Sequence, residues 1–219
     1  MPKLPTIQKD TKLPVLPPLQ TQRWATLYGE SGAGVSTVAL ELAVFLASQY
    51  RVVLLRATPR KGVIFSSSPK NNWFRWAKQG GSLPPQGNFM VILPAPVHRM
   101  GSPVKLARTW LPLVKNTLDE ALQERRLDFV IVDGGESCGA VWDIVGRFPG
   151  LLEVSTRSVG TPAIRNRWQE EQPPGQYGSI PDLPALAVAC AKEDIPMVYA
   201  SGTMKKAFWE LATNLFAAK

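Results

Sequence analysis

Short apolar runs alternate with longer stretches of helical periodicity from residue 24 to the end of this chain. Runs of apolar and β-branched residues predict strands over residues 24–28, 51–55, 89–93, 128–132, 151–155 and 196–200. Apolar residues that recur at helical spacing predict helices over residues 36–49, 73–78, 104–126, 185–191 and 203–217. Buried strands that alternate with helices are typical of parallel sheets. The pattern therefore predicts an α/β fold, in which a mostly parallel sheet is covered by helices on both faces.

The first 22 residues have a different composition from the rest of the chain. They contain few large apolar residues, which predicts an extended tail; both a peptide that docks on a partner and an inert leader fit it. Residues 23–219 are then a single domain, because 219 residues with 45% hydrophobic composition can bury one sizeable core. The prolines of the tail are Pro2, Pro5, Pro14, Pro17 and Pro18.

Positive charge is concentrated in one region of the sequence. The formal net charge is +8, and no acidic residue lies between Glu41 and Asp119. This distribution indicates a basic face for an anionic partner, which is DNA, an acidic protein surface or anionic lipid. A solvated surface that only aids solubility would have the same composition. The candidate partner-binding residues are Arg56, Arg60, Lys61, Lys70, Arg75 and Lys78.

Part of this basic region, residues 69–78, interleaves cations with aromatic residues. That mixture suits phosphate contacts combined with stacking on bases. It also suits a short amphipathic helix at a membrane surface or in a partner's groove. Aromatic residues packed in the core, with their cationic neighbours in solvent, are the alternative.

Several classes of protein are excluded by what the sequence lacks. No run of about 18 apolar residues is present and the first residues carry no apolar stretch, so we expect neither a membrane span nor a signal peptide. Two cysteines, Cys138 and Cys190, are too few for a disulfide framework. Together these features predict a cytoplasmic protein with reduced thiols.

A glycine-rich segment joins the first predicted strand to the first predicted helix. It fits the phosphate-binding pattern G-x-x-x-x-G-K-[ST] except that valine replaces the lysine. In such a loop, backbone N–H groups and a helix N-terminus bind phosphate oxygens, and the lysine adds a positive charge. A tight strand-to-helix turn of small residues is the alternative. The candidate nucleotide-binding residues are Gly29, Glu30, Ser31, Gly32, Ala33, Gly34, Val35, Ser36 and Thr37.

A second motif has the form of a Walker B strand. Four apolar residues are followed by Asp133, and a carboxylate in that position helps to hold magnesium and its water. The loop hydroxyl of Ser36 would be the other protein ligand. The candidate magnesium ligands are therefore Ser36 and Asp133.

The two motifs and the end of the chain together resemble the ParA/MinD family of P-loop ATPases. The motifs lie about 100 residues apart with strands between them. The closing third, with its Ile180-Pro181 segment, an apolar run at 195–200 and a last helix that contains Glu210-Leu211-Ala212, is similar to the closing pattern of that family. The resemblance implies a P-loop NTPase-like three-layer sandwich that binds ATP or ADP with magnesium, forms dimers and acts on DNA or at particular places in the cell.

This chain keeps Asp133 but departs from the family pattern at other charged positions of the site. Glu30 stands where the family has its early loop lysine, and Val35 where it has the second one. After the second strand, residues 56–59 read Arg-Ala-Thr-Pro in place of the family's D-x-D-P. The family's strand that ends in an adenine-reading asparagine has no evident counterpart, because a Pro- and Gln-rich stretch, 171–178, lies in its place.

These departures predict absent or very slow ATP hydrolysis, because the charges that stabilise phosphoryl transfer are missing. ATP or ADP with magnesium would bind weakly or not at all, and no residue is assigned as catalytic. The resemblance implies a scaffold or regulator in DNA partition, conjugation or subcellular positioning, as a homodimer or paired with an active relative. The alternative is an ATPase whose phosphate site is rebuilt with Arg56 or Arg60.

Overall fold

The computed structural model describes residues 14–17, 23–57, 73–94, 111–136, 145–157, 160–169 and 172–217. Their central feature is a seven-stranded sheet in the order β3-β2-β4-β1-β5-β6-β7, in which each pair of neighbouring strands is parallel. The strands are β1 Trp24–Gly29, β2 Arg51–Arg56, β3 Phe89–Leu93, β4 Phe129–Glu136, β5 Leu151–Ser155, β6 Ile164–Trp168 and β7 Gly178–Pro181. The helices are α1 Val35–Ala47, α2 Trp73–Lys78, α4 Leu111–Gln123, α6 Pro184–Glu193, α7 Met197–Ala200 and α8 Gly202–Phe216.

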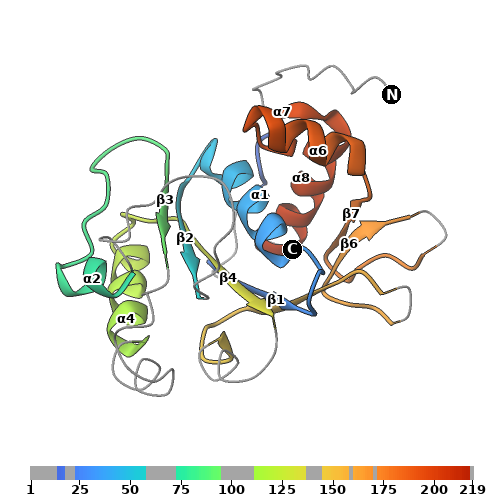
Figure 1. Ribbon diagram of the computed structural model, residues 1–219. Coiled ribbons are helices and arrows are strands. Elements are labelled where there is room, and N and C mark those ends of the chain that lie inside the picture. The colour runs from blue at the N-terminus through green and yellow to red at the C-terminus, as the bar shows by residue number, and fades with distance from the viewer. Residues whose placement is uncertain are drawn as a thin grey trace.

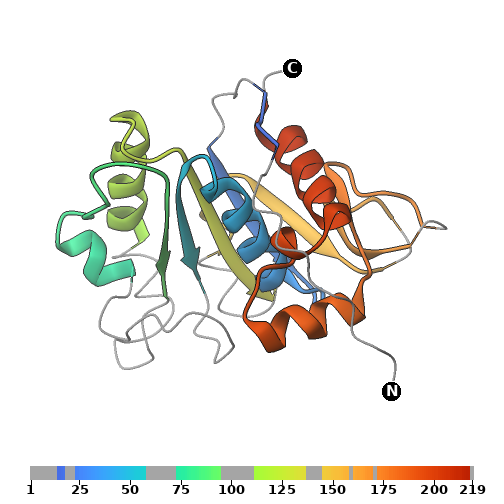
Figure 2. The same cartoon turned by 90° about the horizontal axis from the view of Figure 1, so that it is seen from above.

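Helices cover both faces of the sheet, as the sequence pattern predicts. Figure 1 shows α1 and α8 over one face and α4 beside the other, towards the β3 edge, and Figure 2 gives the same arrangement from above. Strand β2 shows why both faces are apolar, because successive side chains of a strand point to opposite sides. Val52 and Leu54 pack in the cluster with α1 and α8, whereas Val53 and Leu55 pack in the cluster with α2 and α4. The predicted α/β architecture is confirmed.

Most of the predicted elements are present near their expected positions. The first five predicted strands correspond to β1 to β5, and the helices predicted over 36–49, 73–78, 185–191 and 203–217 correspond to α1, α2, α6 and α8. Helix α4 accounts for the described part of the helix predicted over 104–126. None of the helices in the described ranges is long and apolar enough to cross a membrane.

The strand predicted over 196–200 is wrong, because this segment forms the short helix α7. The Glu41 carboxylate on α1 accepts hydrogen bonds from the backbone N–H groups of Met197 and Val198, at 2.8 and 3.0 Å. These are the first N–H groups of α7, which have no partner inside the helix. Burial raises the pKa of Glu41, although the two N–H donors act in the opposite direction. A buried tertiary contact thus overrides the strand preference of an apolar run.

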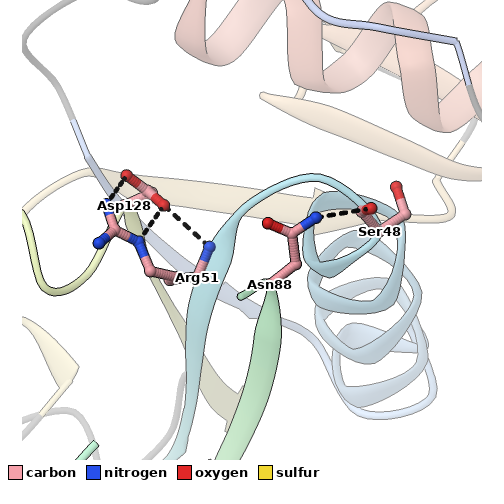
Figure 3. Close-up of polar contacts among 4 residues, drawn as sticks. All are labelled: Ser48, Arg51, Asn88 and Asp128. Atoms are coloured by element: carbon pink, nitrogen blue, oxygen red, sulfur yellow. Dashed lines mark hydrogen bonds and ion pairs between the residues drawn. The ribbon is translucent and has the colours of Figure 1, made fainter. Parts of the chain in front are cut away.

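Polar contacts also hold the amino-terminal ends of the strands together. Arg51 at the start of β2 forms a two-pronged ion pair with Asp128, with Nε–Oδ2 and Nη2–Oδ1 distances of 2.9 Å (Figure 3). The Asn88 side chain donates to the Ser48 carbonyl at 3.1 Å, which ties the start of β3 to the end of α1. Burial alone would raise the pKa of Asp128, but the hydrogen bonds from Arg51 outweigh burial and lower it. Arg51 is therefore committed to a structural contact.

Candidate functional site

The glycine loop lies where the order of the strands diverges. Strand β1 runs into the loop, and its neighbours β4 and β5 belong to opposite halves of the sheet. In open α/β sheets, ligands bind beside the carboxyl ends of the strands at such a divergence point. The predicted nucleotide-binding residues therefore lie in the place where this architecture offers a site.

The glycines of this loop are required by local packing. A side chain at Gly29 would overlap the backbone carbonyl oxygen of Val154 on β5. Gly34 has a positive φ of 77°, and a Cβ there would stand 2.5 Å from the side-chain nitrogen of Asn166. Gly32 has a φ of 82° with open space around it. Close approach to β5 and β6 therefore accounts for two of the three glycines without any ligand.

The first turn of α1 retains the geometry that binds anions. Gly34 is its N-cap, no side chain caps the helix and no acidic residue lies in the first turn. The first N–H groups of a helix lack partners within it, and the helix dipole makes this end positive. Ser36 is half-buried and Thr37 is exposed. The start of α1 thus has uncapped N–H groups of the kind that bind phosphate in P-loops.

Val35 is part of the hydrophobic core and is not exposed at the loop. As the first residue of α1, it is 5% exposed and packs in the core cluster with α1 and α8. A lysine in this position would supply the positive charge of the loop. The substitution therefore removes a charge from the site and adds an apolar side chain to the core.

The two candidate magnesium ligands are in direct contact. The Ser36 hydroxyl donates to Asp133 Oδ1 at 3.0 Å, and the Asp133 side chain is almost fully buried. Arg56 pairs in register with Asp133 across β2 and β4, and its Nε lies 3.6 Å from Oδ2. Each carboxylate oxygen therefore faces a protein group. A guanidinium stands beside the carboxylate that was predicted to hold Mg²⁺, so the residues present do not fit a magnesium ion well.

Glu30 is bound by the end of β5. Its carboxylate forms an ion pair with Arg157, and the hydroxyls of Ser155 and Thr156 lie 3.3 and 3.5 Å from its Oε1. Ser155 Oγ also accepts a hydrogen bond from the backbone N–H of Arg157 at 3.1 Å. The negative charge that replaces a loop lysine is thus offset by an arginine of this chain.

Asn166 belongs to this site although no motif singled it out. It lies on β6, a strand that the sequence pattern did not predict, and its side-chain nitrogen donates to the Ala33 carbonyl at 2.7 Å. Ala33 and Asn166 are both buried, and the backbone N–H of Ala33 donates to the Glu30 carbonyl at 3.1 Å. A strand that carries an asparagine therefore does lie beside the loop, just before the stretch 171–178. Its amide holds the loop.

The structure describes only part of the basic region. The described candidates for partner binding do not form one cluster. Arg56 is turned towards Asp133, whereas Arg75 and Lys78 are exposed on α2. Trp73 and Trp76, which alternate with these cations, are buried in the core and unavailable for stacking on bases. Arg60, Lys61 and Lys70 lie outside the described residues.

Two cavities lie away from the glycine loop. One of about 470 Å³ lies at the amino end of β1, between Arg23, Asp119 and Gly150. The other, of about 440 Å³, follows the edge strand β7 and α8, between Trp168 and Lys206. In the ranges that the structure describes, no group of three His, Cys, Asp or Glu side chains could hold a metal ion.

Neither a scan against protein-family models nor a search of the curated proteins found a match for this chain.

Proposed function

We propose that this chain is a catalytically degenerate relative of the ParA/MinD ATPases, which acts as a scaffold or regulator in DNA partition, conjugation or subcellular positioning. The observation that carries the proposal is the cluster of Ser36, Asp133 and Arg56. The hydroxyl and carboxylate predicted to bind magnesium bind each other, and an arginine supplies the positive charge beside them. The site is complete without a metal ion.

Loss of hydrolysis follows from the charges that a phosphoryl transfer would need. Metal ions bridge the terminal phosphates and neutralise the charge that develops on them, and Arg56 competes with such an ion for Asp133. Val35 is buried and offers no charge to the phosphates. Glu30 places a carboxylate at the loop, although Arg157 offsets it. Backbone N–H groups that position a phosphate do not replace the stabilisation that these positive charges would provide.

The proposed partners are anionic. Arg75 and Lys78 present positive charge on the outer surface of α2, in a region without acidic residues between Glu41 and Asp119. Long-range attraction of this kind suits DNA or an acidic protein surface. The scaffold would act in the cytoplasm, as a homodimer or paired with an active relative.

One observation favours a second function, an ATPase with a rebuilt phosphate site. Arg56 and Ser36 contact the two oxygens of the same carboxylate, that of Asp133. The backbone of Ser36 belongs to the first turn of α1, which no side chain caps. If the Arg56 guanidinium swung from Asp133 to a phosphate, it would replace the missing lysine, and Asp133 would be released to bind magnesium.

Calorimetric titration with ATP and with ADP in the presence of magnesium distinguishes the two functions. We expect no saturable heat for the wild-type chain, and no phosphate release over hours. Arg56→Met is the informative variant, because it removes the charge and keeps a similar length. If the wild type binds nucleotide saturably and Arg56→Met abolishes this binding, the proposal of a degenerate site is refuted. The result would favour the ATPase whose phosphate site is rebuilt with Arg56.

A further inference from the structure

A short proline-flanked segment near the N-terminus is packed against the helical layer. Residues 14–17 read Pro-Val-Leu-Pro, and Leu16 is 6% exposed in the same core cluster as α1 and α8. Figure 2 shows this segment, in blue, beside the red helix α8. Val15, the next residue towards the N-terminus, is 74% exposed. One side chain of the tetrapeptide is therefore the anchor, and its neighbour faces solvent.

Backbone contacts on both sides of the anchor fix the direction of the segment. The indole Nε1 of Trp209 on α8 donates to the Val15 carbonyl at 3.2 Å. The side-chain nitrogen of Gln49, which follows α1, donates to the Pro14 carbonyl at 2.9 Å. Indole donors beside an apolar groove are the groups that read Pro-x-x-Pro peptides, whose prolines restrict the backbone before binding. The surface that holds residues 14–17, formed by Gln49, Trp209 and the core cluster around Leu16, has these components, and we call it the groove.

The Pro-x-Leu-Pro pattern occurs at two further places in the sequence, residues 2–5 and residues 181–184, of which the latter join β7 to α6 within the fold. Residues 2–5 read Pro-Lys-Leu-Pro, with leucine in the anchor position and proline at both ends. The only difference from residues 14–17 is Lys3 in place of Val15, and position 15 faces solvent in the docked copy. A lysine in this position would therefore remain in solvent, and its charge would not have to be buried. Residues 2–5 therefore match every feature of 14–17 that the groove contacts.

We propose that the groove formed by Gln49, Trp209 and the α1–α8 core is a binding site for Pro-x-Leu-Pro peptides, and that residues 2–5 of a second copy of this chain are its ligand in trans. Residues 14–17 fill the site in cis. Because a tethered segment has an effective concentration in the millimolar range, the cis copy dominates in dilute solution. Exchange becomes significant where copies are crowded together, and each exchange joins two chains through the groove.

Fluorescence anisotropy of a labelled peptide with the sequence of residues 1–8 tests this site. The protein is the full chain, as wild type, as Leu16→Ala, which empties the anchor position, and as Val15→Ala, a matched change on the exposed neighbour. We expect Leu16→Ala to bind the peptide at least tenfold more tightly than wild type or Val15→Ala. A peptide with Leu4→Ala should not bind. Equal binding of both peptides, or no gain from Leu16→Ala, would overturn the proposal.

A second measurement needs no variant and does not depend on how well Leu16→Ala folds. The backbone NMR signals of Val15 and Leu16 in the wild-type chain report release of the cis segment. Excess peptide with the sequence of residues 1–8 should move both signals towards random-coil positions, whereas the Leu4→Ala peptide should leave them unchanged. Signals that do not respond to the first peptide would show that residues 14–17 are a fixed part of the fold and that no exchangeable site exists.

Discussion

Replacement of Arg56 by methionine tests whether this arginine takes the place of a metal ion. The change leaves the Asp133 carboxylate, whose side chain is only 4% exposed, with no positive partner at Oδ2. At the observed 3.6 Å separation and an effective dielectric constant of about 20, the attraction between unit charges is roughly 4 to 5 kcal/mol. Part of this is offset, because the variant no longer has a guanidinium to desolvate on folding and the Ser36 hydrogen bond persists. We expect a net loss of about 2 to 3 kcal/mol of unfolding free energy.

Urea denaturation followed by circular dichroism measures this loss, which corresponds to a fall in the midpoint of roughly 1 M. Asp133→Asn is the matched partner, because it removes the charge and keeps an acceptor for Ser36. In a double-mutant cycle, Arg56→Met should cost little on the Asp133→Asn background, which leaves an interaction energy of about 2 kcal/mol. Millimolar Mg²⁺ should restore stability to Arg56→Met alone. Equal losses on both backgrounds would refute the reasoning, since Arg56 would then act through packing rather than charge.

Two further predictions concern the frame around the site. Asp128→Asn should lower the free energy of unfolding by about 1 to 2 kcal/mol at pH 7; because Arg51 holds the pKa of Asp128 below its usual 3.8, this difference should be complete above that value and vanish as the pH falls through the lowered pKa. A difference in urea midpoint that does not shrink as the pH falls below 3.8 would contradict this assignment. Gly29→Ala should cost about 3 kcal/mol, because its Cβ meets the Val154 carbonyl, whereas Gly32→Ala should cost about 1 to 2 kcal/mol for its positive φ alone. Equal urea midpoints for the two variants would show that close approach to β5 does not matter.

The sheet could be predicted because its central strands are recognisable from their local sequence alone. Residues such as Val52 to Leu55 are buried on both faces, so the run is uniformly apolar and does not depend on distant contacts for its identity. The segment at 197–200 was misassigned for the opposite reason. It is equally apolar, but Glu41, more than 150 residues earlier in the chain, caps it as a helix. No local pattern contains that information.

The site was only partly predictable for a related reason. Ser36 and Asp133 belong to motifs with fixed positions relative to a strand end, and they do meet. Arg157 and Asn166 belong to no motif, and their roles depend on the register of β5 beside β1 and of β6 beside β5. Strand β6 reads Ile-Arg-Asn-Arg-Trp, and its first three positions are buried. Because three of its five residues are polar, the sequence pattern does not predict a strand there. Polar residues buried for a specific contact look like a loop in sequence.

The pairing of charges around the glycine loop stabilises its shape. Without Arg56, the buried carboxylate of Asp133 would lose a positive charge 3.6 Å away. Here Arg56 offsets the charge of Asp133 from β2, and Arg157 offsets Glu30 from β5. Arg56 lies on β2, two strands from β1, and Arg157 follows β5, which is next to β1, so the two ion pairs stabilise the loop from opposite sides of β1. Substituting a lysine at position 35 alone should therefore not restore nucleotide binding, since Arg56 would still compete with magnesium for Asp133.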